Sequence, residues 1–400
     1  MKLDLAPDLS PEQQTLLDRV AALAREKLAP RAAEYDRTAT FPSEDFDDLF
    51  RERLHAPTVP RENGGLGLGP VRRDAFTLWM MTKELAKADL SLARCWEGNA
   101  NSLMLLDALA ADDQKRRWFA GAVERGEKWV VWSGEPQARA PGEPSKLGTT
   151  LDRVDGGWVV DGTKVFCTSA GGADWAILLV NPAGPGGARH TASPETLLML
   201  ACPLADPTIE TDGSWWDPVG MRATVSHLVR FEKTFIPDEN RIGDPGQYLV
   251  GNWQTAFAPH YAASFLGAAE AAYDYALEHL ATQGKTGDPY VQQRVAHMSI
   301  HLETGHLWLR HVARLWDEGR REEAQLAGSR VRHIVEHLAE ETLHHAIRAC
   351  GARSLIRPSP LERILRDLTF YIRHDNDDQV LATIGRAALG QPFDASFYRP

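Results

Sequence analysis

The sequence contains few cysteines, and they form no recognisable pattern. Only four cysteines occur among 400 residues, and no two of them make a CxxC pair. Disulfide frameworks and structural zinc sites both need cysteines at short, repeated spacings. We therefore expect free thiols in a reducing compartment, a cytoplasmic protein and no metal site.

Long apolar runs and an excess of positive charge are also missing. No apolar run approaches the roughly 20 residues of a membrane-spanning helix, and the first residues, MKLDLAPDLSPEQQ, lack the basic and apolar segments of a signal peptide. With 44 basic and 55 acidic residues, the net charge of -11 disfavours binding to polyanions. We expect neither a membrane span nor a nucleic-acid partner.

The hydrophobic pattern divides the chain into three parts. Residues 1–127 show the period of amphipathic helices, the first of which starts with a capping box at Ser10-Pro11-Glu12-Gln13. Residues 128–238 contain short β-branched and aromatic runs, with turn signals at Asp155-Gly156-Gly157 and Asp161-Gly162. Long periodic helices return in residues 239–400. The predicted fold is α+β and mainly α, with a middle antiparallel β domain between two helical domains.

A polar segment near the C-terminal end combines many titratable groups. His374-Asp375-Asn376-Asp377-Asp378 lies between two helix-like segments, Leu361–Ile372 and Gln379–Leu389. Asn and Asp often close turns and cap helices, so this segment could simply end one helix and start the next. It also holds more titratable groups than a turn needs, which indicates a functional site as the alternative.

Four motifs, spaced along the chain, resemble those of one known family. Pro60–Gly67 is similar to its P-E-x-x-G-G-x-G loop, and Ser133–Pro136 to its T-E-P turn. Gly162–Ser169 is similar to G-x-K-x-W-I-T-N/S, and Gly220–Pro237 to the segment that begins G-x-R-x-S/T. In this order the motifs resemble the acyl-CoA dehydrogenase superfamily. The resemblance implies an N-terminal helical domain, a β domain and a C-terminal four-helix bundle.

The same resemblance implies FAD, or FMN in a monooxygenase, stacked between the β domain and the bundle. In that family Gly351 would face the cofactor of a neighbouring subunit, and Asp377 and Gln379 would contact the ADP portion. Taken singly, Trp132 and Phe166 could also be ordinary core aromatics, whereas the Thr168 hydroxyl can bond the edge of the flavin. The positions implied for cofactor binding are Trp132, Ser133, Gly134, Phe166, Thr168, Ser169, Gly351, Asp377 and Gln379.

Two enzyme hypotheses follow from the resemblance. In the first, Asp375 takes the position of the dehydrogenase base, removes the α-proton of an acyl-CoA, and electrons pass from FAD to an electron-transfer flavoprotein. In the second, His374 and Asp375 line the pocket of a monooxygenase that receives reduced flavin from a flavin reductase and hydroxylates N, S or C of a small substrate. The breadth of the match favours the dehydrogenase.

Changes at several motif positions keep other interpretations open. Asp375 is one methylene shorter than the family's Glu, and the R-x-x-F motif that holds a neighbour's cofactor reads Ala281-Thr282-Gln283-Gly284. A flavin-binding protein that has lost catalysis is therefore a third hypothesis.

The bundle helices predict a homo-oligomer. One helix carries apolar residues on more than one face, which indicates burial beyond a single chain; they are Leu302, Leu307, Leu309, Val312 and Leu315. We expect a homodimer or homotetramer in light scattering at micromolar concentration, and a monomer there would contradict the prediction.

Overall fold

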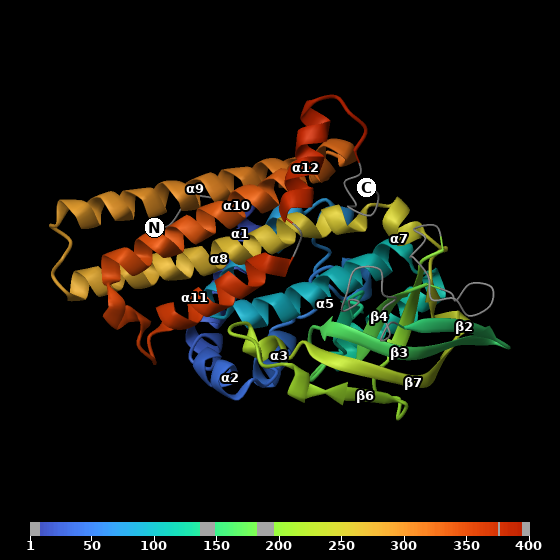
Figure 1. Cartoon of the computed structure of the whole chain (residues 1–400). Helices are drawn as coiled ribbons and strands as arrows, with labels where there is room; N and C mark the ends of the chain where they lie inside the picture. The colour runs from blue at the N-terminus through green and yellow to red at the C-terminus, as the bar shows by residue number, and fades with distance from the viewer. Residues whose placement is uncertain (1–8, 137–148, 182–195, 375–376, 394–400) are drawn as a thin grey trace.

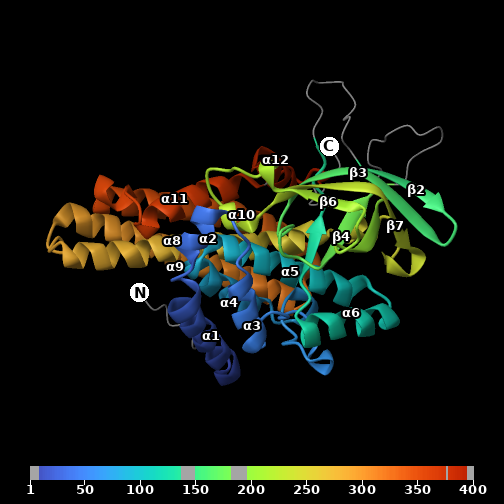
Figure 2. The same cartoon turned by 90° about the horizontal axis from the view of Figure 1, so that it is seen from below.

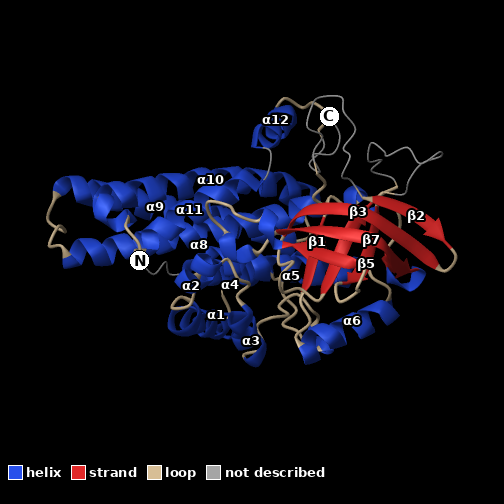
Figure 3. Ribbon diagram, turned by 60° about the horizontal axis from the view of Figure 1, so that its bottom comes forward, coloured by secondary structure: helices blue, strands red, loops and turns tan. Residues whose placement is uncertain are grey.

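A block of helices and a β unit lie side by side in the computed structural model of the chain (Figure 1). The structure describes residues 9–136, 149–181, 196–374 and 377–393. The long helices run alongside one another, and the strands gather at one end of this block, as the colouring by secondary structure shows (Figure 3). Asp375 lies outside the described residues.

The N-terminal helices begin at the predicted capping box. The Gln13 N–H donates to the Ser10 hydroxyl, and the Ser10 N–H donates to the Gln13 side chain at 2.7 Å. Because both orphan donors are satisfied, this part of the prediction is confirmed. The helices are α1 (Pro11–Leu23), a π-helical turn (Ala24–Leu28), α2 (Ala32–Thr38), α3 (Ser43–Arg51), α4 (Ala75–Ala88), α5 (Leu90–Leu109) and α6 (Asp112–Arg125).

Two sheets make up the β unit. The strands are β1 (Trp129–Trp132), β2 (Thr150–Val154), β3 (Gly157–Cys167), β4 (Trp175–Val180), β5 (Leu198–Pro203), β6 (Ile209–Asp212), β7 (His227–Pro237) and β8 (Arg241–Ile242). One four-stranded sheet has the order β1-β4-β5-β8, and the other has the order β2-β3-β7-β6. All pairs are antiparallel as predicted, except that β1 and β4 are parallel. Between these two strands the chain passes through β2 and β3 of the other sheet, so it re-enters the first sheet in the same direction.

One of the predicted turns is wrong. Asp155-Gly156 does close the β2–β3 hairpin, with Val154 paired to Gly157. Asp161-Gly162, in contrast, lies inside β3, where the pairing with β7 shifts between Val160 and Gly162. Gly162 has a φ of 124°, a conformation open to glycine, so the residue makes a β-bulge rather than a chain reversal.

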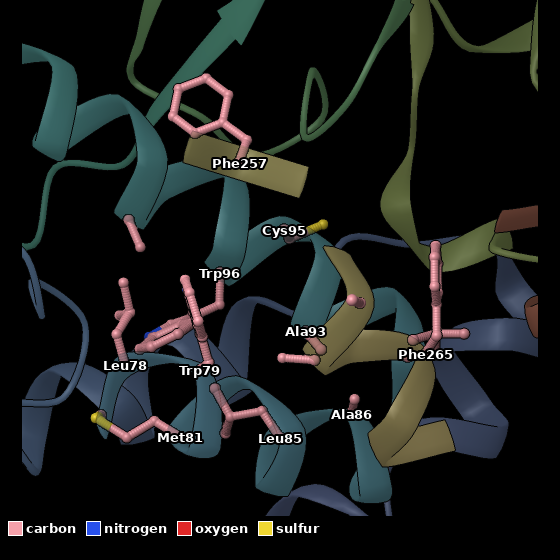
Figure 4. Packing of buried hydrophobic residues seen from close by; sticks show 14 of the residues in the cluster. Leu78, Trp79, Met81, Leu85, Ala86, Ala93, Cys95, Trp96, Phe257 and Phe265 are labelled. Carbon is pink, nitrogen blue, oxygen red and sulfur yellow. The ribbon is translucent and has the colours of Figure 1, made fainter. Parts of the chain in front are cut away.

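The C-terminal part consists of long helices. They are α7 (Gln247–Val250), α8 (Trp253–Thr282), α9 (Pro289–Asp317), α10 (Arg321–Cys350), α11 (Pro360–Tyr371) and α12 (Asp377–Ala388). Helix α8 packs against α4 and α10, so the N-terminal helices and the bundle share one core (Figure 2). Figure 4 shows this packing, with Trp79 of α4, Trp96 of α5 and Phe257 of α8 among the buried side chains.

Most of the apolar residues that predicted oligomerisation are buried inside the single chain. Leu302, Leu309, Val312 and Leu315 pack in the core, whereas the Leu307 side chain is 53% exposed. Intramolecular packing against α8 and α10 therefore accounts for most of the apolar pattern on α9. The oligomeric state stays a prediction.

The cysteines form no cross-links in this fold. All four cysteines are free and buried. Among the described residues, no helix is long and apolar enough to cross a membrane, and no group of three His, Cys, Asp or Glu side chains is arranged to hold a metal ion.

A glycine turn attaches the β unit to α11. A Cβ atom on Gly220 would lie 2.2 Å from the Arg366 carbonyl oxygen, so only glycine allows this approach. Next to it, the Met221 N–H donates to the Asp367 carboxylate at 2.6 Å. Arg366 forms an ion pair with Asp36 of α2 at 2.7 Å. The helix that ends beside His374 is thus fixed to both neighbouring parts of the chain.

Burial raises the pKa of Asp367 to about 7, while Arg363 opposes the shift. Between the ordinary value of 3.8 and about 7, the folded chain then binds more protons than the unfolded chain, so the free energy of unfolding falls as the pH rises through this window.

Asp367→Asn keeps an acceptor for Met221 and removes the titration. From pH 5 to pH 8, we expect the free energy of unfolding to fall by about 1–4 kcal/mol more in the native chain than in D367N. Urea unfolding at both pH values measures this difference. The exposed Asp152→Asn serves as the control, and equal losses in native chain and D367N would contradict the prediction.

Candidate functional site

The ends of β1 and β3 are tied together although they belong to different sheets. The Trp132 indole N–H donates to the Thr168 carbonyl at 3.0 Å, and the Val165 N–H donates to the Gly134 carbonyl at 3.1 Å. A Cβ on Gly134 would lie 2.3 Å from the Val165 carbonyl oxygen, so the two segments touch through their backbones. These contacts bring six of the predicted cofactor positions together in one patch, which we call the strand-end platform: Trp132, Ser133, Gly134, Phe166, Thr168 and Ser169.

Phe166 presents its ring to the outside of this platform. Its backbone has a φ of 52° and its side chain is 59% exposed, so it is not the core aromatic of the ordinary interpretation. The ring meets the edge of Trp215 at 4.9 Å, and Trp216 meets Phe370 of α11 at 5.7 Å. Trp132, by contrast, is buried in the core of the β unit. A row of aromatic rings therefore leads from the platform to α11.

The Thr168 hydroxyl can donate a hydrogen bond to a ligand. Ser226 donates to Thr168 Oγ1 at 3.2 Å, and within the described part of the chain no acceptor takes the Thr168 proton. Ser169 is buried, and its N–H donates to the Thr224 carbonyl at 2.8 Å, so its backbone anchors the platform. The platform fits a flat conjugated ring with polar edges, as in a flavin. It offers a strand end without a side chain at Gly134, the exposed ring of Phe166 and the hydroxyl donor of Thr168.

A buried carboxylate joins three helices next to this platform. Glu97 of α5 accepts from Arg94 Nη1 at 3.0 Å, from the Tyr371 hydroxyl of α11 at 3.0 Å, and from the Ser264 hydroxyl of α8 at 2.7 Å. Burial raises the pKa of Glu97, and the Arg94 guanidinium opposes this shift. We call Arg94, Glu97, Tyr261, Ser264 and Tyr371 the Glu97 cluster; its carboxylate is fully engaged with donors.

His374 stands at the edge of the Glu97 cluster. It ends the 3₁₀ turn Ile372–His374 that continues α11, and it is exposed. Its ring meets Tyr261 at 5.1 Å and Tyr371 at 6.0 Å, each edge to face. The structure therefore brings this predicted catalytic residue to the Glu97 cluster, at the end of the helix whose Phe370 meets Trp216.

The remaining predicted positions lie apart or outside the description. Asp375 is not among the described residues, and for Asp377 only the backbone at the start of α12 is described. Gly351 precedes α11 whereas His374 follows it, and the 12 residues of that helix span about 18 Å. Gln379 lies on α12, which stands out from the bundle beside α10 (Figure 1). Gly351 and His374 therefore lie toward opposite ends of α11.

Sequence patterns reveal no member of the Glu97 cluster. Tyr371 ends α11, and the other members are Arg94, Glu97, Tyr261 and Ser264. They lie inside helices α5 and α8, whose apolar pattern indicates core packing and nothing more. One signal was present: Arg94 and Glu97 stand three residues apart in a helix that is otherwise almost wholly buried. Charged residues are almost never buried unless they are paired, so this spacing could have indicated a buried pair.

Known protein families and proteins match the chain over most of its length. A family model described as the acyl-CoA dehydrogenase N-terminal domain matches residues 10–125, and one described as the acyl-CoA dehydrogenase C-terminal domain matches residues 260–378. The chain is 26% identical over 388 residues to a putative acyl-CoA dehydrogenase of Bacillus subtilis, which covers 94% of this chain and 97% of that protein. It is also 26% identical over 420 residues to a dibenzothiophene monooxygenase of Rhodococcus qingshengii, with 95% and 97% covered.

Solved structures show the same fold in both kinds of enzyme. FMN-bound TdsC from Paenibacillus sp. A11-2 superposes with a TM-score of 0.84 at 23% identity, covering 96% of this chain and 100% of that one. A glutaryl-coenzyme A dehydrogenase in complex with glutaryl-CoA gives a TM-score of 0.84 at 20% identity, covering 99% and 98%. Similarity in fold alone therefore does not separate the two chemistries.

The Glu97 cluster yields a stability prediction. Glu97→Ala would leave the Arg94 guanidinium without its carboxylate in a mostly buried place, and breaking such a pair costs about 3–5 kcal/mol. We expect urea unfolding to show a loss of about 3 kcal/mol or more for E97A, and a smaller loss for E97Q, which keeps acceptor and size. Equal stability of E97A and the native chain would contradict the proposed importance of this carboxylate.

Proposed function

Because the chain belongs to the acyl-CoA dehydrogenase superfamily, we propose that it is a flavin-dependent monooxygenase that takes reduced flavin from a separate reductase and oxygenates a small substrate at N, S or C. One observation carries this proposal. Among the described residues, the titratable side chain at the exposed edge of the Glu97 cluster is that of His374, whereas the Glu97 carboxylate is fully buried and accepts from Arg94, Ser264 and Tyr371.

Glu97 is a poor candidate for the base of a dehydrogenase. A base that removes a proton from carbon needs a free oxygen within hydrogen-bond reach of that proton. Both Glu97 oxygens already accept from Arg94, Tyr371 and Ser264. A dehydrogenase would therefore depend on Asp375, whose side chain is one methylene shorter than the family's glutamate.

His374 suits the proton chemistry of oxygen activation. Reduced flavin, when bound, supplies the electrons that activate O2. The His374 imidazole, held between Tyr261 and Tyr371, can hold a proton and deliver it to reduced oxygen at the end of α11. The aromatic row from Phe166 to Phe370 connects the platform with α11.

The flavin of this proposal is FMN or FAD. Trp132, Gly134, Phe166 and Thr168 would hold the ring. The chain lacks an arginine in the segment Ala281–Gly284 that follows the buried part of α8, so an ADP group would find one cation fewer there. FMN-bound TdsC shares the fold, and the Rhodococcus relative is described as a monooxygenase. These similarities support a flavin-dependent monooxygenase.

The dehydrogenase remains the second candidate function. Asp375 occupies the position of the family's base by resemblance, and several relatives at 25–26% identity are described as acyl-CoA dehydrogenases. This candidate would take an acyl-CoA, keep FAD bound and pass electrons to an electron-transfer flavoprotein. Gly351 would then face the cofactor of a neighbouring subunit, and Asp377 and Gln379 would contact the ADP portion of the cofactor.

The purified protein distinguishes the candidates by its flavin. A colourless preparation that oxygenates substrate only with a flavin reductase, NAD(P)H and flavin supports the monooxygenase. A yellow preparation whose FAD is bleached anaerobically by an acyl-CoA supports the dehydrogenase and rejects the proposal. Tightly bound flavin without either reaction would indicate a catalytically impaired flavin-binding protein.

Two matched variants assign the chemistry to residues. In the monooxygenase, His374→Ala removes the proton donor, so we expect coupled product formation to fall about 10²-fold and release of hydrogen peroxide to rise. Asp375→Asn should have the smaller effect. In a dehydrogenase the order is reversed, because D375N removes the base and substrate-dependent flavin reduction is lost. If both variants kept full turnover, the His374–Asp378 segment would be a helix cap without a catalytic role.

A further inference from the structure

Three histidine rings meet where α9 packs against α10. The two helices run side by side (Figure 1), with His297 and His301 one turn apart on α9 and His345 on α10. The His345 ring stacks on the His297 ring, with the two centroids 4.9 Å apart and an angle of 2° between the ring planes. The His301 centroid lies 5.9 Å from that of His345 and 6.1 Å from that of His297. We call these three residues the histidine cluster.

The Nδ1 atom of His345 has no acceptor for a proton that it would carry. Among the described residues, this atom is sealed from solvent and has no hydrogen-bond partner. A neutral imidazole leaves one ring nitrogen without a proton, whereas an imidazolium carries an N–H on both nitrogens. Protonation of His345 would therefore leave a buried donor unsatisfied, which costs free energy unless the ring moves.

The surroundings of the histidine cluster disfavour a positive charge. Burial and the neighbouring His297 ring lower the pKa of His301. Burial, His297 and His301 lower the pKa of His345, and Arg294 of α9 adds to this effect. Glu341 of α10 opposes the shift at both rings, but it is exposed, so solvent screens its attraction.

The other groups that face the cluster from α10 are a hydroxyl, a fourth histidine and an arginine. Thr342 Oγ1 lies 3.4 Å from His301 Nδ1, and the His344 ring meets that of His345 edge to face at 6.0 Å. Arg348 lies three residues after His345, on the same side of the helix. Helix α8 packs against both α9 and α10, and none of its described charged side chains is among the groups with the strongest effect on these rings.

We propose that the histidine cluster is a pH-sensitive contact between α9 and α10: neutral rings stack and hold the two helices together, whereas protonated rings repel one another and let this end of the pair open. The ordinary pKa of a histidine is 6.5, and in the folded chain the pKa of His301 and of His345 is lower. These rings therefore take up protons more readily in the open state, and opening becomes more favourable as the pH falls below 6.5.

The location of the cluster gives this opening a consequence for the candidate site. His345 lies near the end of α10, which leads through the 3₁₀ turn Ala352–Leu355 to α11, and α11 leads to His374. Acidification would thus loosen the attachment of the helix that carries His374. The proposal itself concerns only the contact of α9 with α10 and does not rest on the proposed function.

Hydrogen exchange on the full chain measures this opening. Exchange is followed by mass spectrometry at about pH 7.5 and about pH 5.5, on either side of the ordinary histidine pKa. After correction for the intrinsic exchange rate, peptides that contain His297, His301 or His345 report the opening equilibrium. We expect opening of these peptides to increase about tenfold or more on acidification, because the open state binds protons more tightly than the closed state.

Substitution of the central ring should remove most of this effect. His345→Phe keeps a ring that can stack on His297 and cannot be protonated, so we expect acidification to change its opening by less than about threefold. His337→Phe is the matched control, because it makes the same change on α10 at an exposed ring whose neighbour, His333, belongs to the same helix. H337F should open on acidification as the native chain does.

A second variant keeps the test valid if His345→Phe does not fold, which circular dichroism checks. His297 is exposed, so His297→Phe places its ring at a position that tolerates the change, and it should reduce the acid-induced opening in the same way.

Three results would overturn the proposal: a native chain that opens equally at both pH values, H345F and H297F that open on acidification as much as the native chain, or an equal increase in α4 and α5. The last result would indicate global unfolding, to which His260 and His306 contribute because burial lowers the pKa of these side chains to about 3 and about 4. A monooxygenase, a dehydrogenase or an inactive protein would show the same exchange, so failure of the proposed function and failure of this inference give different results.

Discussion

The close contact between the Gly220–Met221 turn and α11 is the constraint on which the site depends. Gly220 lets two backbones meet, and the Asp367 carboxylate accepts the Met221 N–H in a place that water does not reach. This contact sets the distance between the β unit, which carries the strand-end platform, and the end of α11, which carries His374. If this contact were lost, the platform and α11 would each keep their own structure, but their positions relative to each other would no longer be fixed.

The Glu97 cluster performs a similar task between helices. One carboxylate collects donors from α5, α8 and α11, so these helices are tied by polar contacts as well as by the apolar packing around Trp96 and Phe265. A buried charge without enough partners costs several kcal/mol, whereas this one has them. The Glu97 cluster therefore joins the three helices at one buried charge.

The elements that the sequence predicted well are those set by local patterns. The capping box at Ser10, the long periodic helices and the strand-end motifs depend on neighbours in the chain, and the structure has them where expected. The turn prediction for Asp161-Gly162 is wrong because a glycine with positive φ occurs in β-bulges as well as in turns. Pairing of β3 with β7 makes this glycine a bulge.

Arg94 and Glu97 could not be assigned a role from the sequence for a different reason. Their partners Ser264 and Tyr371 lie far away in the chain, and helix periodicity says which face is buried but not what that face meets. The same limit applied to α9, where Leu302 and Leu309 turned out to pack within one chain. Sequence patterns thus predicted the fold, whereas the role of His374 stays a prediction and tertiary packing formed the Glu97 cluster.

The contact between Tyr371 and Glu97 joins residues 274 positions apart. No fragment of the chain can therefore contain the whole cluster unless it spans the β unit and the bundle together. In evolution, a change of residue at position 97 restricts which residues fit at position 371. Exchange of one domain between relatives would separate two side chains that match each other. This contact therefore changes through paired substitutions on distant helices, not through the replacement of a module.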